Sequence, residues 1–153
     1  ALVVSVEAEL DRARRLRLAR DRWELRQPAF QAYRDAMTTL LDRLTRLKVP
    51  LEDIKTLAGS SPGALASIQR AASEILKTLS AIEPPEECRA AHALFVSATQ
   101  LADSAAHIRR QAALEGDIGR AWNAASAAAG ALMLEARARV ELLTLLRFPQ
   151  LSP

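Results

Sequence analysis

Residues 84–146 read PPEECRAAHALFVSATQLADSAAHIRRQAALEGDIGRAWNAASAAAGALMLEARARVELLTLL, and this stretch decides the fold. It predicts two long helices that run back to back, joined by one tight turn at Glu115-Gly116-Asp117. The second helix is rich in small side chains, which let a neighbouring backbone come close, so we expect it at the centre of a bundle. These small residues are Ala121, Ala124, Ala125, Ala127, Ala128, Ala129, Gly130 and Ala131.

Apolar residues recur at helical spacing in both of these helices. In the first, the predicted buried face is Ala91, Leu94, Ala98, Leu101, Ala105, Ile108 and Ala112, with Cys88, Phe95 and Ala102 on its flank. In the second it is Ile118, Trp122, Ala125, Ala129, Leu132, Ala136, Val140, Leu143 and Leu146, and Phe148-Pro149 is predicted to stop the helix.

Residues 2–48 carry another helical stripe, and Pro28 lies within it. Proline removes one helical hydrogen bond, but the stripe keeps its phase across it, so we expect a kink near Gln27 rather than a break. Val49-Pro50 is predicted to end this helix. The stripe consists of Leu2, Val6, Leu10, Ala13, Leu16, Trp23, Phe30, Met37, Leu41 and Leu44.

Two further helices are expected between this first helix and Pro84. A short one spans Leu51 to Ala58 and is closed by Gly59. A longer one starts with Ser61 as its cap and Pro62 in its first turn, and it runs to about Ile82. Its predicted buried face is Leu65, Ile68, Ala72, Ile75, Leu79 and Ile82.

Together these segments predict an all-α protein, an up-and-down four-helix bundle with a long first helix kinked at Pro28. We expect one domain over residues 1–153. The first helix is longer than its partners, so residues 1–27 are expected either to protrude as an N-terminal arm or to fold back at Pro28.

The overall charge and the cysteine content restrict the function classes. The net charge is +3, with 18 acidic residues among 21 basic ones, which argues against a nucleic-acid groove. Cys88 is the one cysteine, so no internal disulfide can form. The opening ALVVSV is too short to span a bilayer. It can be the tail of a removed signal, the tail of a membrane anchor, or a first helical turn.

The arm combines arginines with apolar residues, so it can bind a partner protein, pair with a second copy or lie on a membrane surface. The simpler alternative is a solvated helix whose acids and arginines pair four residues apart, as in Asp11 with Arg15. If the arm protrudes, its apolar stripe needs a cover, and self-association is the one we expect first. The predicted interaction residues are Leu10, Arg14, Leu16, Arg17 and Trp23.

No residue set predicts catalysis, and we expect a protein that is not an enzyme. Asp103, Ser104 and His107 share one polar helix face, without the cleft or oxyanion hole that a catalytic triad needs. The five glycines are scattered, so no phosphate-binding loop is present.

Cofactor sites are equally weakly indicated, and no cofactor is expected. Cys88 and His92 lie four residues apart and are weak metal candidates, but a structural zinc needs four ligands. Met37 or Met133 with His92 is an imaginable haem pair, although no CxxCH motif exists. The alanine face of the last helix indicates close packing, with an apolar ligand cavity as the alternative.

The segment LSAIEPPEECRAAHALF, with Leu79, Ile82, Pro84, Pro85 and His92, resembles bacterial extracytoplasmic helical domains of the lipoprotein type. The resemblance covers about residues 76–146, and it implies an exported or membrane-tethered location and no activity. The predicted function is therefore a non-enzymatic interaction or structural domain. The alternatives are the ligand-sensing four-helix bundle of a bacterial receptor and a metal- or haem-binding bundle.

Overall fold

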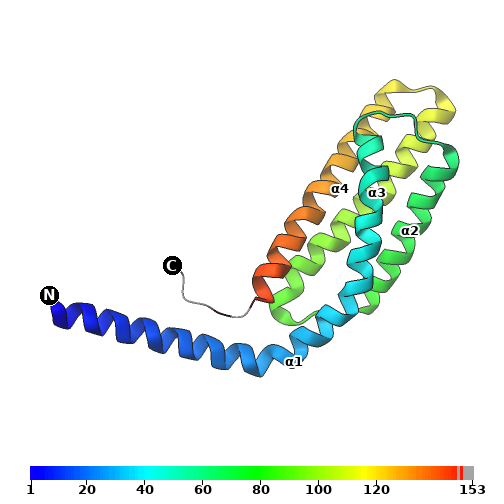
Figure 1. The fold of residues 1–153 in the computed structure, drawn as a ribbon. Helices are drawn as coiled ribbons and strands as arrows, with labels where there is room; N and C mark the ends of the chain where they lie inside the picture. The colour runs from blue at the N-terminus through cyan, green and yellow to red at the C-terminus, as the bar shows by residue number, and fades with distance from the viewer. Residues whose placement is uncertain (148, 150–153) are drawn as a thin grey trace.

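The computed structural model describes residues 1–147 and Pro149. The described residues form helices α1 (Leu2–Lys55), α2 (Pro62–Ala81), α3 (Arg89–Glu115) and α4 (Ile118–Leu145), with a short 3-10 helix η1 (Glu86–Cys88) before α3. Figure 1 shows that the helices of the bundle alternate in direction, and that α1 projects well beyond the other three. The predicted four-helix bundle with a long first helix is confirmed.

α1 is one continuous helix, so the predicted end at Val49-Pro50 and the separate short helix from Leu51 to Ala58 are wrong. Both Pro28 and Pro50 lie inside it. The helix continues through Pro28. Figure 1 shows that α1 changes direction where its projecting part meets the bundle, as a kinked first helix predicts.

Burial explains why Pro50 does not end α1. A proline inside a helix costs about 3 kcal/mol. Leu51 and Ile54 lie beyond it and are buried, and burying each of these side chains contributes about 1.5–3 kcal/mol. Continuing the helix therefore offsets the cost of the proline.

The end of α1 also differs from the prediction. The left-handed residue after the helix is Leu57, with φ 60°, and not Gly59. The chain turns directly after Lys55, where the amide of Thr56 still donates to the carbonyl oxygen of Glu52 at 2.9 Å.

Three other predicted helix ends, at Ser61, Gly116 and Asp117, are confirmed within a residue, whereas α3 begins only at Arg89, after η1. Ser61 caps α2, because its hydroxyl oxygen accepts from the amide of Ala64 at 3.1 Å. Gly116 has φ 63° and ends α3, a conformation that glycine adopts without steric cost. Asp117 caps α4 by accepting from the amide of Arg120 at 3.2 Å. The predicted stop at Phe148-Pro149 falls partly outside the described residues, at Phe148.

The bundle part of α1 buries two series of residues in which the members lie seven apart. This repeat is typical of helices that pack at a shallow angle, as in coiled coils. Tyr33, Leu40 and Leu47 belong to this face and were missing from the predicted stripe. The two series are Phe30, Met37, Leu44 and Leu51, and Tyr33, Leu40, Leu47 and Ile54.

α3 and α4 pack against each other, and in α3 part of the predicted face is confirmed, because Ala91, Ala98, Ala105 and Ala112 are buried. In α3 the expected flank residues Phe95 and Ala102 are buried, whereas Leu101 and Ile108 are only partly covered. A Cβ atom on Gly130 would lie 3.2 Å from the side chain of Leu101, which shows how close the helices are.

In α4 most of the predicted face is wrong, because Ile118, Trp122, Val140 and Leu143 are exposed, although Ala125 and Leu146 are buried as predicted. The buried face is made of alanines with Glu135 and Leu142. Close packing against small side chains outweighs the larger apolar area on the other side of this helix. The buried residues are Ala124, Ala125, Ala128, Ala131, Glu135, Ala138 and Leu142.

Candidate functional site

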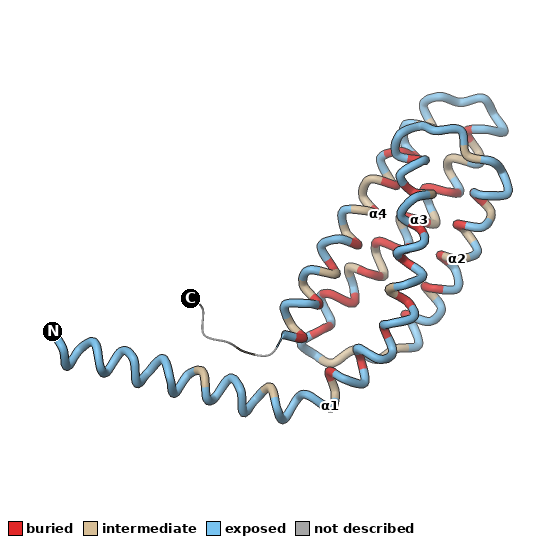
Figure 2. Tube along the Cα trace, viewed as in Figure 1, coloured by how far each residue is buried: buried red, intermediate tan, exposed pale blue. Residues whose placement is uncertain are grey.

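Residues 1–27 form an arm that extends from the bundle as the first part of α1. Figure 2 shows the arm exposed along almost its whole length, up to the point where α1 enters the bundle. Large apolar side chains share this exposure: Leu2 is 82% exposed, Val6 52% and Leu10 50%. None of the helices in the described part of the chain combines the length and hydropathy that crossing a bilayer requires.

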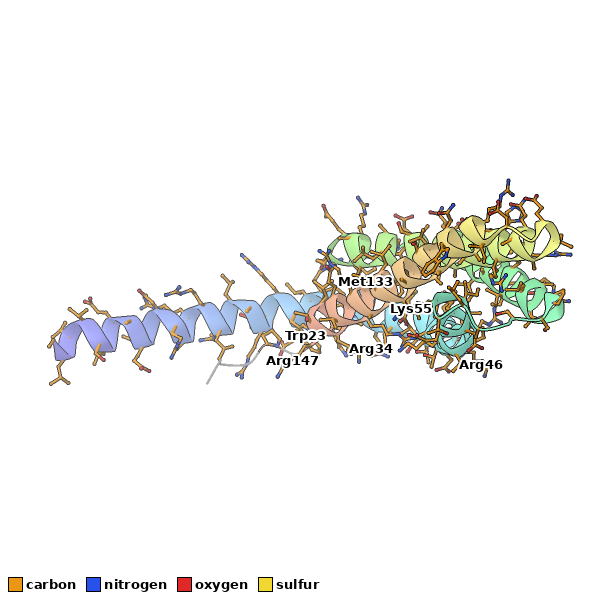
Figure 3. The ribbon with its side chains drawn as sticks, turned by 90° about the horizontal axis from the view of Figure 1, so that it is seen from above. Trp23, Arg34, Arg46, Lys55, Met133 and Arg147 are labelled. Carbon is orange, nitrogen blue, oxygen red and sulfur yellow. The ribbon has the colours of Figure 1, made fainter. Side chains whose placement is uncertain are left out.

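The predicted interaction residues lie along this arm. Leu10, Arg14 and Arg17 are exposed, and Leu16 is half-buried. Trp23 differs from them, because it packs against the hydrophobic core and lies where the arm meets the bundle (Figure 3). Trp23 therefore helps to hold the base of the arm and is less accessible to a partner than expected.

An ion pair anchors the base of the arm to η1. The Nε atom of Arg26 donates to Glu87 Oε2 at 2.8 Å, and its Nη2 donates to Glu87 Oε1 at 2.9 Å. Such two-pronged pairs fix geometry as well as distance. The guanidinium of Arg26 also lies 5.8 Å from the centre of the Phe30 ring.

About two turns beyond Arg26 along α1, a buried polar chain links three helices. The hydroxyl group of Tyr33 lies 2.8 Å from His92 Nδ1, and His92 Nε2 lies 3.0 Å from the carbonyl oxygen of Leu79. Because a carbonyl oxygen can only accept, His92 Nε2 donates, and in the neutral ring Nδ1 accepts from Tyr33. Burial raises the pKa of Tyr33. The chain joins α1, α2 and α3 directly beside the arm.

His92, a candidate ligand for a metal or a haem, is part of this hydrogen-bonded chain. Both ring nitrogens of His92 already have partners, and Cys88 is buried beside it with a thiol pKa raised by burial. Met37 is buried and Met133 is exposed. In the part of the chain that the structure describes, no group of three or more His, Cys, Asp or Glu residues could hold a metal ion.

The polar residues considered for catalysis lie on the outer surface of α3. Ser104 and His107 are exposed and Asp103 is half-buried. Their surface position places them with the solvated face of the helix, as the sequence indicated.

The Arg26–Glu87 pair predicts a pH dependence. The hydrogen bond from Arg26 lowers the pKa of Glu87. The stabilisation is therefore complete above the ordinary glutamate value of about 4.3, and it is lost as the pH falls through the lowered value of the folded state. We expect the chain to melt at a higher temperature than Glu87→Gln at pH 7.

The matched measurement is a melting series of both proteins from neutral to acid pH. Their difference should be constant well above the ordinary glutamate value of about 4.3, and it should shrink as the pH falls through the lowered pKa of Glu87. A difference that stays constant over this range, or that is absent at pH 7, would show that the ion pair does not anchor the arm.

A second set of contacts holds α1 against α4. Arg139 forms an ion pair with the buried Glu135, and its Nη2 donates to the carbonyl oxygen of Leu41 and to Thr45 Oγ1, each at 2.7 Å. At the end of α4, Arg34 Nη2 donates to the carbonyl oxygen of Leu146 at 3.1 Å. The part of α1 that carries the arm is thus fixed from two sides.

A groove of about 260 Å³ lies between α1 and α4 near these contacts. Its lining is mainly apolar, with one arginine from each helix. Among its lining residues are Arg34, Met37, Leu41, Arg139, Leu142 and Leu146.

The outer face of α4 is a second uncovered apolar surface. α4 buries its alanine face, so its large apolar side chains lie on the opposite, exposed face. Trp122 is 61% exposed, and Met133 and Leu143 more than 70%. Val140 lies between Met133 and Leu143 on the same face.

Sequence reasoning missed the residues that hold the arm. Nothing in the spacing pairs Arg26 with Glu87 or Tyr33 with His92, because each pair joins segments about sixty residues apart. Comparison with protein-family models, curated proteins and solved structures finds no match for this chain.

Proposed function

We propose that this chain is a non-enzymatic interaction module, in which the bundle holds out the arm so that it can pair with another helix. One observation carries the proposal: the arm exposes a stripe of large apolar side chains that no described residue of the bundle covers. Covering such side chains contributes about 1.5–3 kcal/mol each, so a partner that supplies an apolar face gains substantially.

The anchoring of the arm supports an interaction role. The Arg26–Glu87 pair, the Tyr33–His92 pair and the packing of Trp23 all lie at its base, and together they restrict how α1 leaves the bundle. A helix that is held in place loses less freedom on binding, which favours association. The partner we favour is a second copy of the chain, as expected from the mixed charges of the arm.

The groove between α1 and α4 is the observation that favours the ligand-sensing alternative. Its volume is below the 300–1,000 Å³ or so that is typical of sites for drug-sized ligands. A ligand there would leave the exposed arm without a role. The interaction module accounts for the arm and is therefore preferred.

Removing residues 1–21 tests the proposal, because this cut leaves Trp23 and the Arg26–Glu87 pair in place. We expect the full chain to be a dimer in solution and the truncated chain to be a folded monomer, as measured by light scattering and circular dichroism. The physical reason is the loss of the apolar stripe from Leu2 to Leu16.

The matched control removes apolar area elsewhere. Met133→Ser with Val140→Ser takes similar side chains from the outer face of α4 and should leave the dimer intact. If this control is monomeric while the truncated chain stays dimeric, the contact is on α4 and the proposal is wrong. A full chain that is monomeric at high concentration would also contradict it.

A further inference from the structure

The charges along the arm are separated into two blocks. Glu7, Glu9 and Asp11 form an acidic block, and the next nine residues contain five arginines and no acid. All of these charged side chains are exposed, and Leu16, which lies among the arginines, is half-buried. Two copies of such a segment attract each other only when they run in opposite directions, because a parallel arrangement sets each block against its own charge.

We propose that the arm pairs antiparallel with the arm of a second copy, crossing near Ala13. This proposal rests on the interaction role of the arm and adds its partner, direction and register. With Ala13 opposite its own copy, Leu10 of one chain meets Leu16 of the other. Glu9 then lies opposite Arg17 on both sides of the crossing.

Apart from Leu10, the residues of this pairing lie together along one face of the arm. Glu9, Ala13, Leu16, Arg17 and Arg20 line a single shallow groove along the helix. Ala13 has the smallest side chain among the residues that line this groove, so the two helices can approach closely at the crossing. Asp11 contacts Arg14 within its own arm at 3.8 Å, but both side chains are largely exposed, so this pair does not compete strongly.

Charge variants test the direction of pairing. Glu9→Arg places like charges at both symmetry-related contacts, and so does Arg17→Glu. Each should weaken the dimer about tenfold, as judged from concentration-dependent sedimentation. The double variant Glu9→Arg/Arg17→Glu exchanges the two charges and should restore the dimer. In a parallel pair each position faces its own copy, so a single variant replaces one like-charged contact by another. The single variants would then not weaken the dimer, and the double variant would restore nothing.

Cysteine cross-linking tests the register. With Cys88→Ala as the background, Ala13→Cys should form a disulfide-linked dimer under mild oxidation. Val6→Cys should not form one. In the proposed register Val6 lies opposite residue 20, so the two Val6 positions are about 21 Å apart along the helix. A disulfide needs about 7 Å or less between Cα atoms.

The outcomes separate this inference from the proposed function. Cross-linking of both variants, or of neither, overturns the antiparallel register while a truncation-sensitive dimer would still support the interaction role. A full chain without any self-association overturns both. If Cys88→Ala fails to fold, the charge exchange decides alone: restored association supports the antiparallel pair, and unrestored association overturns it.

Discussion

Replacing Arg139 with methionine should lower the free energy of unfolding by about 3–5 kcal/mol. The side chain of Glu135 is only 7% exposed, and its charge is balanced by Arg139 one turn away. Glu135 Oε2 is buried and has no hydrogen-bond partner among the described residues. Removing the guanidinium therefore leaves a carboxylate in an apolar helix interface, and it also breaks the hydrogen bonds to Leu41 and Thr45.

Two controls make the result specific, with urea unfolding as the measurement. Arg137→Met removes an exposed ion pair with Glu141 from the same helix and should cost less than about 1 kcal/mol. The double variant Glu135→Leu/Arg139→Met removes both charges, and it should be much closer to the parent in stability than Arg139→Met alone. Equal losses in Arg137→Met and Arg139→Met would contradict the role of this pair.

The helix ends could be predicted well where one residue controls the local geometry. Ser61, Gly116 and Asp117 act through hydrogen bonds or backbone angles within a few residues, so their neighbours in the sequence are sufficient. Pro50 was wrongly predicted to end α1, because a local property does not decide the structure there. Its local cost is real, but the burial of Leu51 and Ile54 against other helices decides the outcome, and that burial is not local.

The face of α4 could not be predicted from its apolar residues because both sides of the helix are apolar. Large side chains such as Trp122 and Leu143 favoured one side, while the packing against α3 selected the alanine side. Glu135 also argued against burial of the alanine face, since a charged residue is seldom buried without a partner. Arg139 is that partner, four residues further along.

The arm could be inferred from the length of the first helix and from Pro28, but not its anchoring. Arg26 and Tyr33 find Glu87 and His92 only once the chain has folded back through α2. The arm exposes Leu10 and Arg17 as expected, and whether they contact a second copy stays a prediction. Trp23 was assigned to the same surface, yet it packs on the core.

Phe95→Ala should destabilise the protein by about 3–5 kcal/mol, because it removes the largest of the fully buried side chains. The neighbouring core is rich in alanines, whose short side chains cannot extend into the space left behind. Ala98, Ala102 and Ala128 are all buried. The cavity should therefore persist, and the cost should lie near the upper end of this range.

The matched control is Leu114→Ala on the same helix, where the side chain is 80% exposed and the change should stay within about 0.5 kcal/mol. Leu101→Ala should fall between the two, since Leu101 is only partly covered. A larger loss at Leu101 than at Phe95 would restore the face that the sequence predicted for α3. Because the arm lies outside this core, Phe95→Ala should lower stability without abolishing self-association under conditions where the bundle remains folded.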